Sequence, residues 1–324
     1  MSMKFRTEIE KIGWKSPIEY SSHILTLGSC FAERISSILS ERKFSVTALP
    51  TGILFNPASI AQSINLMASR HKISEEELME VDGRWLSYNF HSSISSTTRQ
   101  EARAVMQEAI DRGGEALDKA THLIITLGTA WVYRLRESGS VVANCHKQPA
   151  SLFSRELLSV ESIVEILRPI CERFKGEIIL TVSPVRHVGE GLVDNSLSKA
   201  ILRVAVDTLQ CQFPERITYF PAYEILIDDL RDYRFYTEDL VHPAPMAVEY
   251  IAEKFFEVAL SPQSKGLMTR VERIVQASRH RPLNPQSESY KTFCLRQLDA
   301  IREIKGVDLS KEKHFFDTML QINL

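Results

Sequence analysis

The stretch that decides the fold is His23-Ile-Leu-Thr-Leu-Gly-Ser-Cys-Phe-Ala-Glu-Arg-Ile35. Its first half is short, apolar and rich in branched residues, and it stops at Gly28. This pattern predicts a buried strand over residues 23–28. The second half repeats apolar residues at helical spacing, which predicts a helix over residues 30–42. A strand that turns directly into a helix leaves the first N–H groups of the helix unpaired above the turn.

Ser29 lies at this turn. Its hydroxyl is expected at the positive end of the helix dipole, beside N–H groups that can hold an oxyanion. The simpler interpretation is that Ser29 only caps the helix, a common role of serine. Far downstream, Asp239-Leu-Val-His-Pro243 places an acid and an imidazole three residues apart. A weak hydroxyl nucleophile needs a base and the base needs an orienting group, so Ser29, His242 and Asp239 are the candidate catalytic residues.

Composition limits the classes of function. The chain has 324 residues, of which 44% are hydrophobic and 25% charged, as in an ordinary soluble globular protein. A net charge of −2 gives no electrostatic basis for binding nucleic acid or an anionic membrane. No apolar run reaches the roughly 18 residues of a bilayer span, and residues 1–10 contain no apolar signal core. We therefore expect a cytoplasmic protein with no nucleic-acid or membrane partner.

The five cysteines are scattered along the chain and include no C-x-x-C motif. Their odd number and spacing argue against a disulfide framework and against a thiolate zinc site. Four histidines could meet at one edge of the fold: His91, His146, His187 and His242. The sequence has no H-E-x-x-H motif and no short-range pair of ligands. Structural or hydrogen-bonding histidines are therefore the better interpretation, and we expect neither a metal nor a cofactor.

Further buried strands are predicted over residues 44–49, 122–127, 177–182 and 217–220, with helical patterns between them. Strands separated by helices imply an α/β fold with a mostly parallel, doubly wound sheet. The chain between residues 131 and 144 is typical of a hairpin. The helix predicted over residues 99–118 is expected to break or loosen at Gly113-Gly114.

The amino-acid composition of the chain changes after Pro262. Residues 264–281 are basic, and one amphipathic helix is predicted between Tyr290 and Ile304. We therefore expect an α/β domain over residues 1–260 and a helical extension over residues 261–324. The extension would cover the main domain or a partner subunit, which makes it a candidate surface for a homo-oligomer.

The carboxyl ends of parallel strands form the ligand-binding edge of such a sheet. The sequence places polar residues after each predicted strand or close beyond it. They are Ser29, Gly52 and Asn56, Gly128 and Thr129, Arg186 and His187, and Asp239 and His242. Five separate stretches are thus expected to meet at one edge, which favours catalysis over helix capping for Ser29.

Several short sequence motifs resemble those of the GSCFA domain family, and they occur in that family's order over about residues 20–260. The first is Gly28-Ser-Cys-Phe-Ala32, which spells the family's name. The others are Gly52-Ile-Leu-Phe-Asn-Pro57, Phe90-His-Ser92, Thr126-Leu-Gly-Thr-Ala-Trp-Val-Tyr133, Asn144-Cys-His-Lys-Gln-Pro149, Ser183-Pro-Val-Arg-His187, Phe220-Pro-Ala-Tyr-Glu224, and Asp232-Tyr-Arg-Phe-Tyr236 through His242-Pro243.

The GSCFA group is in turn similar to the SGNH, or GDSL-like, hydrolases. This resemblance implies a flavodoxin-like three-layer α/β/α fold, esterase or deacylase activity without a metal, and a Ser29–His242–Asp239 triad. Two positions depart from the SGNH pattern. Gly28 stands where that pattern has an Asp, and Ala130 stands where it has the Asn that donates to the oxyanion. Losing such a donor typically costs about 2.7–4 kcal/mol of transition-state stabilisation.

The expected mechanism is attack of Ser29 on an acyl carbonyl, with His242 as base and water clearing the acyl-enzyme. The N–H groups of Ser29 and Gly52 are expected to hold the oxyanion. Asn56, Thr129, Asn144 and His91 are candidates to replace the missing Asn. Arg186, His187 and Lys147 could bind hydroxyls or a carboxylate of the substrate. The complete set of residues expected to bind the oxyanion or substrate is Gly52, Asn56, Gly128, Thr129, His91, Asn144, His146, Arg186 and His187.

An ester of small-molecule or glycan type, such as an O-acylated carbohydrate, is the expected substrate by analogy with the superfamily. Aromatic residues Trp131, Tyr133, Phe235 and Tyr236 could line a sugar site, although core packing is the ordinary role of such residues. Three alternatives stay open. Cys30 could be the nucleophile, since a thiol at a helix N-terminus can have a lowered pKa. An alcohol could replace water, which would make the chain an acyltransferase. The domain could also bind a glycan or acyl ligand without turning it over, because Ala130 removes a donor.

Overall fold

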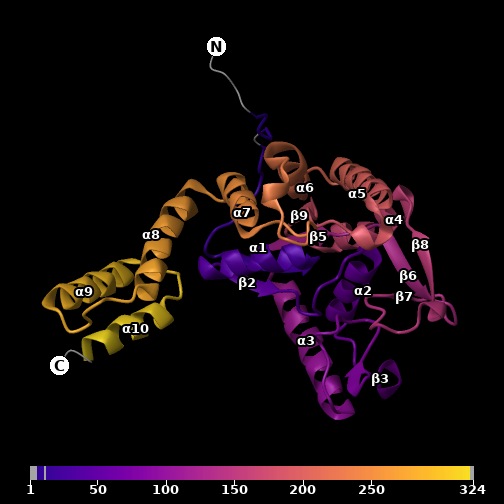
Figure 1. Ribbon diagram of the computed structural model, residues 1–324, viewed down its shortest axis with the longest axis horizontal. Coiled ribbons are helices and arrows are strands. Elements are labelled where there is room, and N and C mark those ends of the chain that lie inside the picture. The colour runs from indigo at the N-terminus through magenta and orange to yellow at the C-terminus, as the bar shows by residue number, and fades with distance from the viewer. Residues whose placement is uncertain (1–5, 11, 322–324) are drawn as a thin grey trace.

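The computed structural model describes residues 6–10 and 12–321. Residues 1–5, part of the polar segment that argued against a signal sequence, lie outside the described residues. The centre of the fold is a parallel five-stranded sheet in the order β10-β9-β5-β1-β2 (Figure 1). Its strands are β1 (His23–Gly28), β2 (Ser45–Ala48), β5 (His122–Leu127), β9 (Glu177–Val182) and β10 (Ile217–Tyr219).

Numbered along the chain, these five strands follow the order 2-1-3-4-5, which is the flavodoxin-like order. In this order the chain reverses direction across the sheet between β1 and β5, which pair with Gly28 opposite Thr126. Ligands of such sheets bind outside the strand ends at this reversal. The topology therefore places Ser29, the residue after β1, at the expected binding edge.

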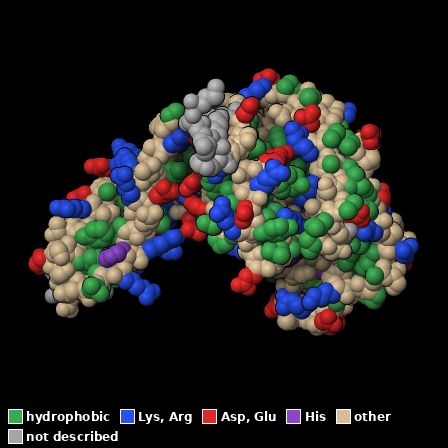
Figure 2. Space-filling model, turned by 45° about the horizontal axis from the view of Figure 1, so that its top comes forward, with side chains coloured by type: hydrophobic (Ala, Val, Ile, Leu, Met, Phe, Trp, Pro, Cys, Tyr) green, Lys and Arg blue, Asp and Glu red, His purple; other side chains and the backbone are tan. Residues whose placement is uncertain are grey.

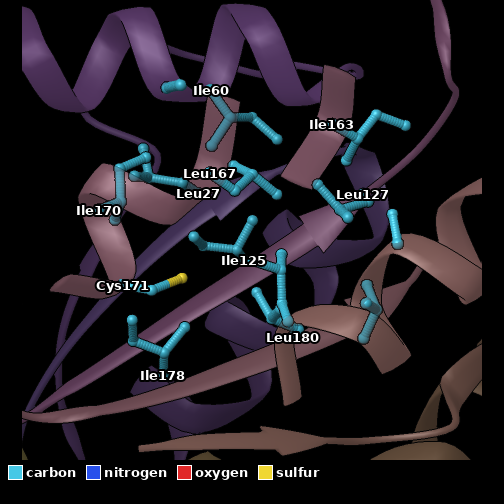
Figure 3. Packing of buried hydrophobic residues seen from close by; sticks show 14 of the residues in the cluster. Leu27, Ile60, Ile125, Leu127, Ile163, Leu167, Ile170, Cys171, Ile178 and Leu180 are labelled. Atoms are coloured by element: carbon cyan, nitrogen blue, oxygen red, sulfur yellow. The ribbon is translucent and has the colours of Figure 1, made fainter. Parts of the chain in front are cut away.

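Helices cover both faces of the sheet and make the three-layer α/β/α architecture that the sequence predicts. One face packs against α2 (Pro57–Ala68), α4 (Val160–Arg173) and α5 (Leu192–Gln212). Figure 3 shows this core, with Leu27, Ile125 and Leu180 of the strands meeting Ile60, Ile163 and Leu167 of the helices. The other face packs against α1 (Cys30–Glu41) and α7 (Pro245–Ala259). Strand residues alternate between the two cores because successive side chains point to opposite faces.

Smaller elements decorate this framework. β3 (Met79–Val81) and β4 (Arg84–Leu86) form a hairpin, and the short turn η1 (Glu75–Glu77) precedes it. The expected hairpin of β6 (Trp131–Leu135) and β7 (Val141–Val142) has a third member, β8 (Phe153–Leu157). The remaining short turns are η2 (Ala150–Leu152), η3 (Val188–Glu190), α6 (Ala222–Glu224), η4 (Ile225–Leu230) and η5 (Tyr233–Phe235).

Helix α3 (Arg99–Lys119) runs unbroken through Gly113 and Gly114, so the expected break is wrong. A Cβ at Gly113 would lie 2.2 Å from Met67 Sδ, and one at Gly114 would lie 2.6 Å from Met67 O. The two glycines are therefore required by the close approach of α2 and α3. Glycine costs helix stability, but here that cost is offset by packing.

The C-terminal helices α8 (Pro262–Arg279), α9 (Glu288–Glu303) and α10 (Ser310–Gln321) project from the main body, as Figures 1 and 2 show. They pack around a hydrophobic cluster of their own. Ionic contacts join them to the end of α1: Arg42 pairs with Glu272 of α8 and Glu249 of α7, and Lys43 lies 2.7 Å from Glu312 of α10. The division at residue 260 remains our proposal.

Candidate active site

Ser29 occupies the N-cap position of α1, but its hydroxyl does not act as a cap. The backbone N–H donates to Thr126 O at 3.1 Å, which ties the residue to β5. The side chain is fully buried and makes no capping hydrogen bond, and Oγ has no hydrogen-bond partner among the described residues. A buried polar atom without a partner costs about 1–3 kcal/mol, which makes this hydroxyl unusual and suggests a role other than stability.

Asp239 and His242 form the pair that their spacing predicts. His242 Nδ1 donates to Asp239 Oδ2 at 2.7 Å. The other carboxylate oxygen accepts from the Thr237 hydroxyl and from the N–H groups of Val241 and His242. These hydrogen bonds, with that of Thr237 the strongest, hold the pKa of Asp239 well below its usual range. An ionised carboxylate on Nδ1 leaves Nε2 of the neutral imidazole as the acceptor that a general base needs.

A pocket of about 440 Å³ lies at this edge of the sheet. Cys30, the residue after Ser29, lines it together with His242 and His187. The other lining residues are Phe55, Asn56, Thr129, Trp131, Tyr133, Val142, Ala143, Asn144, Cys145, Val185, Arg186 and Val241. Residues from all five stretches that the sequence singled out therefore lie at this pocket or next to it.

Ser29 and His242 are not hydrogen-bonded to each other in the part of the chain that the structure describes. The hydroxyl is enclosed, whereas the side chain of His242 is 47% exposed. Catalytic hydrogen bonds are often long before substrate binds and shorten in the complex. The three side chains therefore lie at one edge of the sheet, with no hydrogen bond between Ser29 and His242.

The segment between Gly52 and Asn56 crosses the ends of β1 and β5. Leu54 N–H donates to Gly28 O at 2.8 Å, and Phe55 O accepts from the N–H groups of Gly128 and Thr129. The N–H of Gly52 itself donates to Leu49 O at 2.8 Å, and that of Ser29 is used by Thr126. Our expectation that these two N–H groups hold the oxyanion is therefore wrong for this structure, because both serve the backbone.

The other expected binding residues divide into two groups. Asn56, Thr129 and Asn144 line the pocket, but each side-chain oxygen accepts from a nearby backbone N–H, those of Ser59, Trp131 and His146 respectively. Two histidines serve loop structure outside the pocket. His91 Nδ1 accepts from Ser93 N–H beside Gly52, and His146 Nε2 donates to Ser87 O. Burial lowers the pKa of both histidines.

Arg186 and His187 lie in the loop after β9. Arg186 N–H donates to Val241 O at 3.2 Å, which joins this loop to the one carrying His242. The guanidinium of Arg186 lies over the ring of Tyr236, 4.1 Å from its centroid. The His187 ring stands edge-on to Phe55, and its Nε2 is buried with no hydrogen-bond partner among the described residues. The pKa of His187 is lowered to about 4, mainly by burial and to a lesser extent by Lys199 and His242.

Lys199 is the site residue that the sequence did not reveal. It is 1% exposed, and its ammonium donates to Gly128 O at 2.6 Å and to Ser183 O at 2.7 Å. It therefore joins the ends of β5 and β9 directly beneath the pocket. Asn195 and Ser198 of the same helix also face this edge, through His187 N–H and Thr129 Oγ1. The available signal was three polar residues at i, i+3 and i+4 on a helix face that should be apolar.

Cys30 is half-buried at the pocket. Burial raises the pKa of its thiol, outweighing the opposing effect of the N–H groups at the start of α1. This direction does not favour the alternative in which Cys30 is the nucleophile, because the cost of enclosing a thiolate exceeds the benefit of the helix N-terminus.

No group of three or more His, Cys, Asp and Glu side chains among residues 6–10 and 12–321 is arranged to hold a metal ion. In the same described part of the chain, none of the helices combines the length and apolarity that a membrane crossing requires.

The fold and this edge define an α/β protein with a serine, a histidine and an aspartate at the ligand-binding end of its sheet. The GSCFA family model matches residues 23–255, and the model for the C-terminal domain of GSCFA domain proteins matches residues 271–322. The chain belongs to the GSCFA family.

No curated protein matches the chain. A solved structure from Streptococcus pneumonia, described provisionally as a platelet activating factor, is 12% identical. The match covers 74% of this chain and 84% of that one, with a TM-score of 0.37. This likeness is too weak to carry an argument about activity.

Proposed function

We propose that this protein is a serine ester hydrolase in which Ser29 is the nucleophile, His242 the general base and Asp239 the group that orients the base. The observation that carries the proposal is the 2.7 Å hydrogen bond between His242 and Asp239, at a pocket that His242 shares with the residue after Ser29. The resemblance to SGNH hydrolases supports the same roles.

In the proposed reaction, Ser29 Oγ attacks the ester carbonyl while its proton passes to His242 Nε2. Asp239 stabilises the imidazolium that forms, because its low pKa keeps it ionised at neutral pH. The tetrahedral intermediate then expels the alcohol, which takes the proton from His242. Water, activated by the same imidazole, hydrolyses the acyl-enzyme and releases the carboxylic acid.

This mechanism requires movement at the nucleophile. Since Ser29 Oγ is enclosed and His242 is half-exposed, substrate binding must open the pocket toward the hydroxyl. Rotation about the serine χ1 angle exchanges staggered rotamers. The required change is therefore local, and the strand that carries Ser29 can keep its place in the sheet.

The pocket indicates the kind of ester. Its walls are mostly apolar and aromatic, with a few polar groups, as is common for sites that bind small molecules. Trp131 and Tyr133 can pack against a sugar ring, and Arg186 can bind a hydroxyl or carboxylate. A small ester, such as an O-acylated carbohydrate, fits this lining.

The experiment compares wild type, Ser29→Ala and Ser36→Ala with 4-nitrophenyl acetate and with a fluorophosphonate that labels active serines. Ser36 is a matched control because it is another buried serine of α1, bonded to Thr26 and Ala32. We expect Ser29→Ala to lose about 10⁴-fold or more in kcat, and to lose the label at residue 29. Unchanged turnover in Ser29→Ala would remove Ser29 from the mechanism.

The complete burial of Ser29 favours one second candidate: a domain that binds a glycan or acyl ligand without turning it over. Calorimetry with an acetylated sugar, followed by product analysis after long incubation, separates the two. Heat of binding with no product and no labelled serine would favour the binding domain. Transfer of the acyl group to an added alcohol in place of water would instead indicate an acyltransferase.

A further inference from the structure

Buried polar atoms without partners belong to two residues that line this pocket and to Ser29, which precedes the lining residue Cys30. Among the described residues, seven buried side-chain polar atoms have no hydrogen-bond partner, and three of them are Ser29 Oγ, Trp131 Nε1 and His187 Nε2. Each such atom lowers the stability of the fold, so several of them at one site are explained if a bound ligand supplies the missing hydrogen bonds. One is the proposed nucleophile, and the other two can be hydrogen-bond donors.

His187 is fixed on several sides. Its N–H donates to Asn195 Oδ1 at 2.9 Å, and its ring stands edge-on to Phe55 at 5.5 Å between centroids. The hydrogen bond from Arg186 N–H to Val241 O holds its loop against the loop of His242. Nε2 lies 3.2 Å from the position that a Cβ on Gly128 would take. The ring nitrogen therefore lies next to Gly128 at the end of β5, the strand that pairs with β1, and β1 ends one residue before Ser29.

The surroundings of His187 decide its charge. Burial, Lys199 and His242 all disfavour the imidazolium and lower the pKa of His187 to about 4. The other titratable groups at this pocket include Arg186, Tyr133, Cys145 and the half-buried Cys30, and the ionised Asp239 pairs with His242. His187 is consequently neutral at pH 7, a weak base that can still donate one N–H. His242 instead pairs with the Asp239 carboxylate, so the two histidines have different partners and can take different roles.

We propose that His187, neutral and protonated on Nε2, donates a hydrogen bond to the oxyanion formed when Ser29 attacks the ester carbonyl. This inference rests on the proposed function and supplies the donor that Ala130 lacks. As the Ser29 Oγ–carbon bond forms, the carbonyl π electrons move to oxygen and the serine proton moves to His242. When the carbon–oxygen bond to the alcohol breaks, that proton goes to the alcohol. His187 keeps its own proton throughout.

The enclosed setting makes this donor effective. Hydrogen bonds to a developing charge are worth more where water is excluded than in bulk solvent. Ser29 Oγ and His187 Nε2 are both shielded and have no partner among the described residues, so a carbonyl that reaches Ser29 from the pocket lined by His187 would find both groups available. Lys199 acts here as a positioning residue, because it fixes the carbonyls of Gly128 and Ser183 on either side of the donor's loop.

The test uses three variants of the full chain: His187→Leu, His187→Gln and Trp131→Phe. Leucine removes the donor, whereas glutamine restores an N–H at a similar distance from the backbone. We expect His187→Leu to lower kcat for 4-nitrophenyl acetate about 10²–10³-fold with KM changed little, and His187→Gln to recover most of that loss. Trp131→Phe removes the other buried N–H at the pocket and should cost less. The acid limb of the kcat/KM profile should persist in every variant, since His242 is the base.

Several outcomes would overturn the inference. A folded His187→Leu variant with the kcat of wild type, a glutamine variant no better than leucine, or a larger loss in Trp131→Phe would each assign the donor elsewhere. Loss of the acid limb in both His187 variants would make His187 the base. Absence of Ser29-dependent turnover in wild type would instead defeat the proposed function, and this inference with it.

A second measurement does not depend on the variants folding. In wild type labelled with ¹⁵N-histidine, NMR at pH 7 should show His187 as the neutral Nε2–H tautomer. Reaction of Ser29 with a phosphonate, whose oxygen stands in for the oxyanion, should shift the Nε2–H proton downfield. A cationic ring, an Nδ1–H tautomer, or no shift in the labelled protein would contradict the proposal.

Discussion

The two sides of the site are built in different ways. On the strand side, Ser29 Oγ, His187 Nε2 and Lys199 are enclosed. The first two atoms have no hydrogen-bond partner among the described residues, and the Lys199 ammonium donates to two backbone carbonyls. On the loop side, Asp239 and His242 are 48% and 47% exposed, and their geometry comes from short hydrogen bonds within residues 237–242. The strand-side residues are buried with the core, whereas the loop-side residues lie at the protein surface.

This difference teaches how stability and chemistry are divided. Enclosed polar groups raise or lower the free energy of unfolding, so their substitution should alter both stability and turnover. Exposed groups in a short loop contribute little to folding, so changing them should alter turnover alone. The predictions below test this separation.

Among the variants that follow, the largest expected effect is on the loop side. Asp239→Asn should lower kcat about 10²–10⁴-fold, because the amide no longer fixes the His242 tautomer or stabilises its cation. The melting temperature should stay close to that of wild type, since the side chain is exposed. Asp232→Asn is the matched control: its carboxylate is also exposed and accepts from Arg234 N–H. Equal losses in both variants would show that the loop as a whole, rather than the Asp239–His242 bond, sets the rate.

On the strand side, Lys199→Met should destabilise the fold by about 2–4 kcal/mol, because the buried carbonyls of Gly128 and Ser183 lose a charged donor. Urea unfolding measures this directly. Arg203→Met, on the same helix but in partly exposed ion pairs, should cost less than about 1 kcal/mol. A Lys199 variant as stable as wild type would mean that the ammonium is not part of the core, and the contrast between the two sides would fail.

Acid should weaken the fold through His187. The unfolded chain takes up a proton near pH 6.5, whereas folded His187 takes it up only near pH 4. Stability should therefore fall as pH decreases through this window, by at most about 3 kcal/mol from this residue. His187→Gln should flatten that part of the curve, whereas His280→Gln, in the exposed linker, should not. Identical slopes for wild type and His187→Gln would show that His187 is not held neutral by the fold.

The smallest effect concerns the cysteines. Because burial raises the pKa of Cys30, iodoacetamide at pH 7 should alkylate it about tenfold more slowly than the exposed Cys211 of the same chain. Peptide mass spectrometry of a time course compares the two residues in one sample. Faster labelling of Cys30, with loss of activity that Cys30→Ser prevents, would restore the cysteine nucleophile as an alternative.

The sheet could be predicted because its strands are short buried runs that end at glycine or polar residues. The predicted ranges 23–28, 122–127 and 177–182 coincide with β1, β5 and β9. β8 could not be predicted, because Phe153-Ser-Arg-Glu-Leu157 is charged and lies at the edge of its sheet. Helix α10 was missed because its few apolar residues are buried only through contacts with α8 and α9.

The site divides in the same way. The Asp239–His242 hydrogen bond was predictable, because two residues three positions apart in a tight loop are kept close together by the backbone. The enclosure of Ser29 was not, since it depends on how the segment carrying Leu54 and Phe55 crosses two strand ends. Lys199 was hidden because a lysine on a helix is usually solvated. Its burial follows from two carbonyls that only the assembled sheet brings together.

Helix α1 has the proposed nucleophile at one end and Arg42 at the other. It contains 12 residues, so it is a rod about 18 Å long. Glu41, Arg42 and Lys43 at its tip meet Arg279, Glu272 and Glu312 of the C-terminal helices, and only Glu249 among these ionic partners precedes residue 260. Truncating the chain after residue 260 would remove the ionic partners Arg279, Glu272 and Glu312 from the C-terminal end of α1. We expect α1 then to tilt about its N-terminal turn at residue 29. We therefore expect the orientation of Ser29 to depend partly on residues 261–324, about the last fifth of the chain, which contribute no residue to the lining of the pocket.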